Sequence, residues 1–263
     1  MKISLLISTY NWPEALELVI NSAIIQSVSP AEIIIADDGS NDETKLLIEQ
    51  FKQKTAIPIN HVWQEDLGFR KSKILNKAIV KTTTDYIIQI DGDCIMNRYF
   101  VEDHLKAAKK GVYLYGSRVN ILLDYVADVF GKKQIDFNFF SNEIKNRSRS
   151  LHIPFLSHFY KTHNEISKKF RGCNVSYWRD DFIEVNGYNE DFEGWGREDS
   201  DLVIRMGNNG IKAKRLRYAG IVFHVFHEIN SKEKFELNDK IQNETVSKKT
   251  IRISNGIDQY LKK

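Results

Sequence analysis

Residues 170–205 read FRGCNVSYWRDDFIEVNGYNEDFEGWGREDSDLVIR. Inside this stretch, the residues from Gly194 to Asp201 (GWGREDSD) place an aromatic ring between two glycines and then three carboxylates within four positions. Glycine carries a high conformational entropy cost, and clustered carboxylates repel one another unless a cation or a proton donor lies among them. The apolar run that begins at Leu202 is typical of a buried helical turn, so the acidic cluster lies where a loop becomes a helix. The pattern predicts a functional site or, as the simpler alternative, a helix start capped by Glu198 or Asp199.

Composition predicts a globular protein. The chain has 263 residues, of which 42% are hydrophobic and 11% aromatic, enough to form a core. Its 38 basic and 35 acidic residues leave a net charge of only +3, so we do not expect a nucleic-acid partner. Cys94 and Cys173 are far apart and lack metal-ligand spacing, which indicates free thiols. The first apolar run, Ile3 to Ile7, is too short for a signal peptide, and no run reaches transmembrane length, so the expected compartment is the cytoplasm.

Outside the acidic stretch, short β-branched runs alternate with helical patterns, which is typical of an α/β fold. The expectation is a single mixed, mostly parallel central sheet flanked by helices. The first helix should begin at Pro13, and Asp42 is expected to cap the second. The expected strands are Ile3–Ser8, Glu32–Asp37, Ile59–Trp63, Tyr86–Ile90, Val112–Ser117 and Ile221–Phe223.

Polar residues follow three of these strands, at residues 8–11, 37–40 and 91–93. Ligands of open α/β sheets collect at the carboxyl ends of the strands, so we expect these residues to face one site. Asp91 and Asp93 repel each other unless a cation lies beside them. Oxygen ligands favour Mg²⁺ or Mn²⁺, and such ions commonly share their shell with substrate phosphates.

Two further choices arise from the sequence. Arg70 follows a glycine-bearing turn and is interpreted as a ligand contact, whereas its neighbour Lys71 is interpreted as solvated surface charge. Either His224 or His227 could complete a metal shell, and only one is expected to do so, because residues three apart in an extended segment point to opposite faces.

The remaining segments carry less information. Residues 120–169 lose the regular pattern and are interpreted as a mobile or substrate-covering insertion. We therefore divide the chain into a nucleotide-sugar-binding half (residues 1–118), an acceptor-binding and catalytic half of the same domain (residues 119–227), and a helical C-terminal tail (residues 228–263).

Four motifs carry a family resemblance: ISTYN at residues 7–11, ADDGS at 36–40, DGD at 91–93, and the run from Gly172 to the GWGRED motif at 194–199. As a set, they resemble the GT-A glycosyltransferases of family 2, which have a Rossmann-like fold, and the second half is similar to a galactosyltransferase-type acceptor region. The resemblance spans residues 3 to about 227. Arg197 departs from it, since galactosyltransferase-type relatives often have glycine there.

The resemblance implies roles for individual residues. Asp199 falls at the position of the catalytic base. For the donor nucleotide the resemblance implies uridine contacts for Ser8, Tyr10 and Asp38 and further nucleotide contacts for Arg70 and Asp91. For the metal it implies ligation by Asp91, Asp93 and His224, with His227 as the alternative to His224. For the acceptor it implies contacts for Trp195, Gly196 and Glu198. If Asp199 is only a helix cap, Asp201 or Glu198 becomes the base.

These roles imply an inverting transferase that depends on Mn²⁺ or Mg²⁺. It would move a hexose or N-acetylhexosamine from a UDP-sugar to a saccharide or lipid-linked saccharide, such as a glycolipid, in surface polysaccharide or lipopolysaccharide synthesis. Peripheral contact with the inner surface of the cytoplasmic membrane is a further expectation.

Two other functions remain open at this stage. Asp91 and Asp93 also resemble the nucleophile strand of haloacid-dehalogenase-type phosphatases, in which the first Asp attacks phosphorus and the second acts as an acid. That interpretation leaves residues 170–200 unexplained. The other alternative is a non-catalytic sugar-nucleotide-binding protein, which would tolerate loss of the base.

Overall fold

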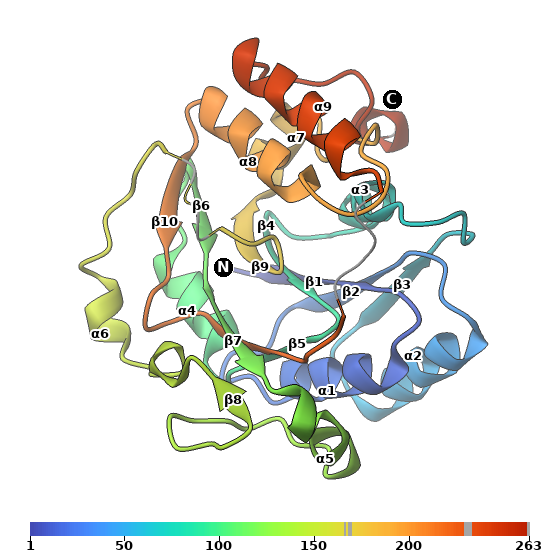
Figure 1. The fold of residues 1–263 in the computed structure, drawn as a ribbon, viewed down its shortest axis with the longest axis vertical. Coiled ribbons are helices and arrows are strands. Elements are labelled where there is room, and N and C mark those ends of the chain that lie inside the picture. Colours follow the sequence, from blue (N-terminus) through green and yellow to red (C-terminus); the bar gives the residue numbers. More distant parts are fainter. Residues whose placement is uncertain (166, 168–169, 229–232, 262–263) are drawn as a thin grey trace.

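The computed structural model describes residues 1–165, 167, 170–228 and 233–261 (Figure 1). Within these residues, seven strands form the central sheet, in the order β10-β6-β9-β4-β1-β2-β3. Their bounds are Ile3–Thr9 (β1), Glu32–Asp37 (β2), Ile59–Trp63 (β3), Tyr86–Asp91 (β4), Val112–Tyr115 (β6), Asn174–Trp178 (β9) and Lys212–Arg215 (β10).

The central sheet is mixed and mostly parallel, as the sequence predicts. Strand β1 pairs in parallel with β2 and β4, β2 with β3, and β10 with β6. Strand β9 is the exception, because it pairs antiparallel with both β4 and β6. Alternate side chains of each central strand enter opposite cores: Leu5 and Ile7 pack in one, and Leu6 in the other.

Helices cover both faces of this sheet (Figure 1). Helices α1 (Pro13–Ile24) and α2 (Asp42–Lys54) lie on one face, and α3 (Lys71–Val80), α7 (Arg179–Glu184) and α8 (Glu198–Asn208) lie on the other. The expected cap of α2 is wrong by one residue. Asn41 caps it, because its side chain accepts a hydrogen bond from the amide of Glu43 (3.1 Å), and Asp42 is the first helical residue.

A second, four-stranded sheet, which the sequence does not predict, lies beside the first in the described part of the chain. It consists of β5 (Cys94–Met96), β11 (Ile221–His224), β7 (Ser117–Ile121) and β8 (Ile144–Lys145). The expected single strand Val112–Ser117 is therefore wrong, since the chain leaves β6 at Gly116 and enters β7. A Cβ atom at Gly116 would lie 2.3 Å from the carbonyl oxygen of Gly220, so only glycine fits at this crossing.

The irregular region contains short elements: α5 (Val126–Gly131), β8, and α6 (Pro154–Ser157). Helix α4 (Phe100–Ala107) precedes β6, and α9 (Phe235–Ser247) occupies the tail and packs on α8. Parts of both regions, residues 166, 168–169, 229–232 and 262–263, lie outside the described residues, and the division into two halves and a tail stays a prediction. Among the described helices, none is long and apolar enough to span a bilayer.

The register of the sheet brings the polar strand ends together. Thr9 pairs with Asp37, and Ser8 pairs with Asp91, so the carboxyl ends of β1, β2 and β4 meet at one edge. This edge is where an open α/β sheet places its ligand site.

Candidate active site

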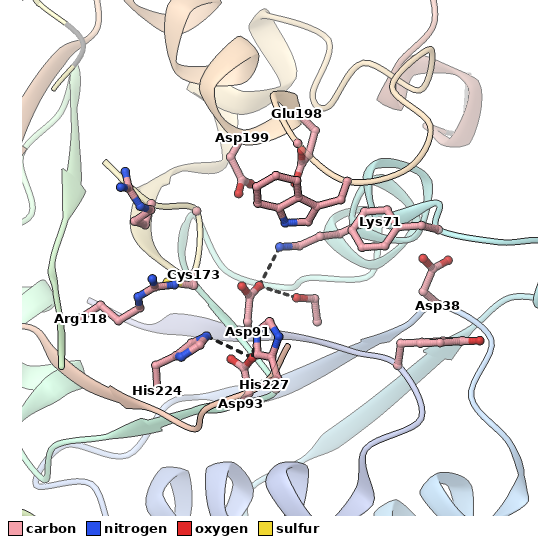
Figure 2. Close-up of a pocket in the computed structure, with 18 of the residues that line it drawn as sticks. Asp38, Lys71, Asp91, Asp93, Arg118, Cys173, Glu198, Asp199, His224 and His227 are labelled. Carbon is pink, nitrogen blue, oxygen red and sulfur yellow. Dashed lines mark hydrogen bonds and ion pairs between the residues drawn. The ribbon is translucent and has the colours of Figure 1, made fainter. Parts of the chain in front are cut away.

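A cleft of about 1200 Å³ opens at this edge (Figure 2). Its walls come from the ends of β1, β2 and β4, from the chain after β11, and from the start of α8. The cleft brings together eleven of the twelve residues implied by the family resemblance: Ser8, Tyr10, Asp38, Asp91, Asp93, Trp195, Gly196, Glu198, Asp199, His224 and His227.

Asp38 occupies one side of the cleft and is held firmly. Its carboxylate accepts hydrogen bonds from the Gln64 side chain (2.6 Å) and from the amide of Arg70 (2.7 Å). Burial nevertheless raises the pKa of Asp38 above its usual value. Tyr10 stays half exposed beside it and donates to Asp66 (2.9 Å). This wall offers fixed polar groups to a ligand.

Arg70 is the one implied residue that the structure does not bring to the cleft wall. Its guanidinium donates to the backbone carbonyl of Glu65, and its backbone amide holds Asp38. The side chain that lies in the cleft instead is that of Lys71, so the interpretation of Lys71 as solvated surface charge is wrong.

The ammonium of Lys71 lies at the centre of the site, 2.7 Å from Asp91 Oδ1, which also accepts a hydrogen bond from Ser8 Oγ (2.8 Å; Figure 2). Burial alone would lower the pKa of Lys71, but the charges of Asp91, Asp199 and Glu198 hold it well above the usual value. Lys71 is therefore the cation that the clustered carboxylates need.

Asp93 lies next to Asp91 and faces two imidazoles. Its Oδ2 is 3.4 Å from His224 Nε2 and 3.3 Å from His227 Nε2. The expectation that only one histidine faces the carboxylates is wrong: β11 ends at His224, and the next residues leave the strand conformation, so both rings turn the same way. Asp91, by contrast, is not in this group of ligand atoms, which all lie within 4.8 Å of one another.

The electrostatics of this group follow from burial and proximity. Burial alone would raise the pKa of Asp93, but the hydrogen bond from His227 and the charges of both imidazoles outweigh it and lower the pKa. The same hydrogen bond raises the pKa of His227, whereas burial lowers the pKa of His224. One carboxylate and two imidazoles form a donor set that fits a divalent transition-metal ion with open positions for other ligands.

Asp199 lies at the start of α8, across the cleft from Asp93 (Figure 2). Its Oδ1 accepts a hydrogen bond from Tyr188 Oη (3.1 Å), and Tyr188 Oη in turn accepts one from Gln89 Nε2 (2.8 Å) on β4. Burial raises the pKa of Asp199, while the Lys71 ammonium acts in the opposite direction. Neither Glu198 nor Asp199 is the N-cap residue, because Arg197 occupies the cap position. Both lie in the first turn of α8, where a carboxylate faces the positive end of the helix dipole.

Glu198 precedes Asp199 and is also buried, with 6% of its surface exposed. Burial, together with the charge of Asp199, raises its pKa to about 7. Its Oε2 lacks a hydrogen-bond partner among the described residues. A buried carboxyl oxygen of this kind is costly unless a ligand group completes its hydrogen bonding.

Asp201, the third carboxylate of the motif, has a structural role. It is fully buried and binds Arg205 Nε (2.8 Å) and the Thr245 hydroxyl (2.7 Å). Because it does not line the cleft, Asp201 is not an alternative base.

The loop that carries Trp195 is held from outside by α9. The buried side-chain amide of Asn238 donates to the carbonyls of Glu193 and Gly196, both at 3.0 Å, and Trp195 stacks on Phe235 with 6.1 Å between ring centroids. The C-terminal helix therefore fixes the loop that precedes Glu198 and Asp199.

Gly172 determines how closely Asp199 approaches β9. A Cβ atom at Gly172 would lie 1.9 Å from Asp199 Oδ2. The family resemblance implies that Asp199 is the catalytic base. On that basis we expect Gly172→Ala to displace this carboxylate and to lower turnover by about 10²-fold, because misplacement of a reacting group by about 1 Å can cost that much. Steady-state rates would measure the effect.

The matched control is Gly131→Ala, where an added Cβ meets nothing within 4 Å. Circular dichroism should show that both variants keep the fold. If Gly172→Ala and Gly131→Ala retain equal turnover, the close packing of Asp199 against residue 172 has no catalytic importance.

Comparison with known proteins agrees with this architecture. Residues 4–169 match the sequence model described as glycosyl transferase family 2, and residues 154–228 match one described as the N-terminal domain of galactosyltransferase. The chain therefore belongs to glycosyl transferase family 2 and has a galactosyltransferase-type C-terminal region. The phosphatase interpretation of Asp91 and Asp93 is wrong, because both residues lie inside the family match.

Among relatives, validoxylamine A glucosyltransferase of Streptomyces hygroscopicus subsp. limoneus is 25% identical over 234 residues, covering 80% of this chain and 48% of its own. Chondroitin synthase of Escherichia coli is 24% identical over 224 residues, which cover 79% of this chain and 32% of the synthase. The chain thus spans less than half the length of these two relatives.

Two solved structures share the fold. The mannosyltransferase PcManGT of Pyrobaculum calidifontis, in complex with GDP-Man and Mn²⁺, has a TM-score of 0.63 at 16% identity, covering 97% of this chain and 65% of its own. S. aureus TarS 1-349, in complex with UDP-GlcNAc, has a TM-score of 0.62 at 15% identity, and the match covers 92% of this chain and 65% of the TarS chain. At such identities the likeness shows the GT-A fold.

Proposed function

We propose that the protein is an inverting, metal-dependent glycosyltransferase that moves a hexose or N-acetylhexosamine from a UDP-sugar to a saccharide or lipid-linked saccharide. The observation that carries the proposal is that a buried carboxylate, Asp199, and the cluster of Asp93, His224 and His227 line the same cleft. Family membership and the nucleotide sugars bound by the two similar structures support it.

The proposed chemistry assigns proton transfer to Asp199. An acceptor hydroxyl is a poor nucleophile, so Asp199 takes its proton as the oxygen attacks the anomeric carbon from the face opposite the leaving diphosphate. This attack inverts the configuration and gives a β-linked product from an α-linked donor. Glu198 binds an acceptor hydroxyl through its unpartnered oxygen, and Trp195 supplies an apolar face for the sugar ring.

The donor lies along the opposite wall. Ser8, Tyr10 and Asp38 contact the uridine, and Asp91, held by Lys71, contacts the nucleotide. Asp93, His224 and His227 would hold a divalent ion, which supplies charge neutralisation for the leaving diphosphate. Two imidazoles in the donor set favour Mn²⁺ over Mg²⁺, because Mg²⁺ prefers oxygen ligands.

For the product and the location we propose surface polysaccharide or lipopolysaccharide synthesis at the cytoplasmic side of the inner membrane. The similarity to chondroitin synthase supports the proposed role in polysaccharide synthesis. The buried free thiols Cys94 and Cys173 fit a reducing compartment such as the cytoplasm.

The test of the proposed function is UDP release from a panel of UDP-sugars, measured with and without Mn²⁺. We expect slow, metal-dependent hydrolysis of one donor and its loss in EDTA. Full activity in excess EDTA would contradict metal dependence, and binding of UDP without any turnover would favour a non-catalytic sugar-nucleotide-binding protein.

A second measurement tests the metal cluster. Because both histidines face Asp93, we expect His224→Ala and His227→Ala each to weaken Mn²⁺-dependent UDP binding by at least about tenfold, as even supporting residues of metal sites do. Calorimetric titration of UDP at fixed Mn²⁺ would measure it, with the exposed His158→Ala as the control. Retention of native affinity by either variant would remove that histidine from the site.

A further inference from the structure

Four arginines, which we name the arginine track, lie near one another, and the first of them lines the cleft: Arg118, Arg149, Arg215 and Arg217. Arg118, on β7, lines the cleft. Arg149 Nη1 donates to the backbone carbonyl of Arg118 (3.2 Å), and Arg217 Nη2 donates to that of Ser148 (3.0 Å). The track therefore continues outward from the cleft wall across three segments that are distant in sequence.

The track lies away from the proposed uridine contacts. Figure 2 shows Arg118 and Asp38 at opposite sides of the cleft, with Asp91 and Lys71 between them. Arg118 also lies near the Asp93 cluster: burial lowers the pKa of His224, and the charge of Arg118 adds to this effect. A donor held by Asp38 and this cluster therefore approaches the inner end of the track. The acceptor must approach Asp199 from the remaining side.

Among the described residues, no ion pair compensates the positive charge of the track. None of the ion pairs formed among the described residues includes any of the four arginines. Arg215 Nε and Arg217 Nη1 are buried, and neither has a hydrogen-bond partner in the described structure. Burial, followed by the charge of Arg217 and, more weakly, that of Arg149, lowers the pKa of Arg215.

Arg215 and Arg217 differ from a fully solvated surface arginine. A surface arginine keeps its guanidinium in water, whereas here two guanidinium nitrogens are withdrawn from water and Arg217 packs on the ring of Tyr218, 4.5 Å from its centroid. Buried donors without acceptors are costly, and like charges brought together add to that cost. An oxyanion bound beside the track would offset the repulsion between these like charges.

We propose that the arginine track binds an oxyanion of the acceptor, so that the acceptor is an anionic saccharide carrying phosphate or carboxylate groups. The inference rests on the proposed glycosyl transfer and adds the chemical class of its acceptor. The planar guanidinium fork matches the geometry of both anions, so the track alone does not distinguish them.

The experiment titrates the protein, saturated with UDP and Mn²⁺, with three oligosaccharide-like probes of equal length. They are a neutral glucan tetrasaccharide, a tetragalacturonic acid and a glycerol-phosphate tetramer. We expect one or both anionic probes to bind at least about tenfold more tightly than the neutral probe, and the affinity to fall with added salt. The probe that binds identifies carboxylate or phosphate as the recognised group.

Variants connect that affinity to the track. Arg149→Ala and Arg217→Ala should each weaken binding of the anionic probe by about tenfold. Arg217→Lys keeps the charge but loses the planar guanidinium, so its effect on this affinity should be intermediate. Lys45→Ala, an exposed position on α2 with the same change in charge, should have no effect. The affinity for UDP should stay native in all four variants.

Three results would overturn the inference: equal affinity for neutral and anionic probes, equal effects of the arginine variants and Lys45→Ala, or a loss of UDP affinity in the arginine variants, which would assign the track to the donor. A failure of the proposed function is distinguishable, because the wild-type protein would then release no UDP from any UDP-sugar with Mn²⁺, a measurement made without any of the three probes.

Discussion

Replacing Asp199 with asparagine is expected to lower sugar transfer by about 10²–10⁴-fold, the usual contribution of a general base. The substitution keeps the shape of the side chain and the hydrogen bond from Tyr188 but removes the charge that accepts the proton. UDP affinity should stay native, because Asp38 and the Asp93 cluster lie elsewhere in the cleft. Transfer rates and calorimetric UDP affinity, measured on the same preparation, would show the two effects separately.

Two companion variants sharpen this result. Asp38→Ala should weaken UDP binding first, because Asp38 lies on the wall proposed to contact the uridine. Glu198→Gln should affect acceptor KM more than UDP affinity. If Asp199→Asn retains near-native transfer while Glu198→Gln loses it, Glu198 is the base, since Asp201 is occupied by Arg205 and Thr245.

Replacing Lys71 with methionine is expected to reduce kcat/KM by about 10²-fold, because removing one partner of this partly buried ion pair leaves the charge of Asp91 without its cation. The ammonium lowers the pKa of both Glu198 and Asp199, so its loss raises both values. Less of the base is then ionised at neutral pH. The acid limb of the kcat/KM profile should therefore move to higher pH.

The matched control is Lys73→Met, two residues along the same helix, which loses the same charge without a contact to Asp91. Its pH profile should match that of the wild type. The proposed role of Lys71 is wrong if Lys71→Met reduces the rate but leaves the acid limb where it was, because the loss would then come from packing alone.

Much of the fold was predictable because local patterns and tertiary structure agree. The expected strands Glu32–Asp37 and Ile59–Trp63 have the observed bounds, since β-branched runs between turn residues determine both the local conformation and the burial. The meeting of residues 8–11, 38 and 91–93 in one cleft also follows from sequence, because parallel strands end at a common edge.

The rest depends on contacts that only the folded chain defines. Lys71 has the sequence signature of a surface lysine, and its ion pair with Asp91 exists because α3 and β4 come together. The common orientation of His224 and His227 depends on the end of β11 at His224, after which the chain leaves the strand conformation and the strand periodicity no longer applies. Gln89, one polar residue in the apolar strand Tyr86–Ile90, was the available signal for the Tyr188–Asp199 hydrogen bonds.

The position of β9 has a consequence for how the protein is made. This strand lies between β4 and β6, and Ile88 on β4 pairs with Ser176, 88 residues later (176 − 88). When only the first half of the chain has been synthesised, β9 does not yet exist and one edge of β4 has no partner strand. Strand pairings between residues so far apart in sequence also form slowly. An open apolar edge attracts other nascent chains. We expect fragments that end before residue 174 to aggregate, and folding of the complete chain to be limited by the insertion of this one strand.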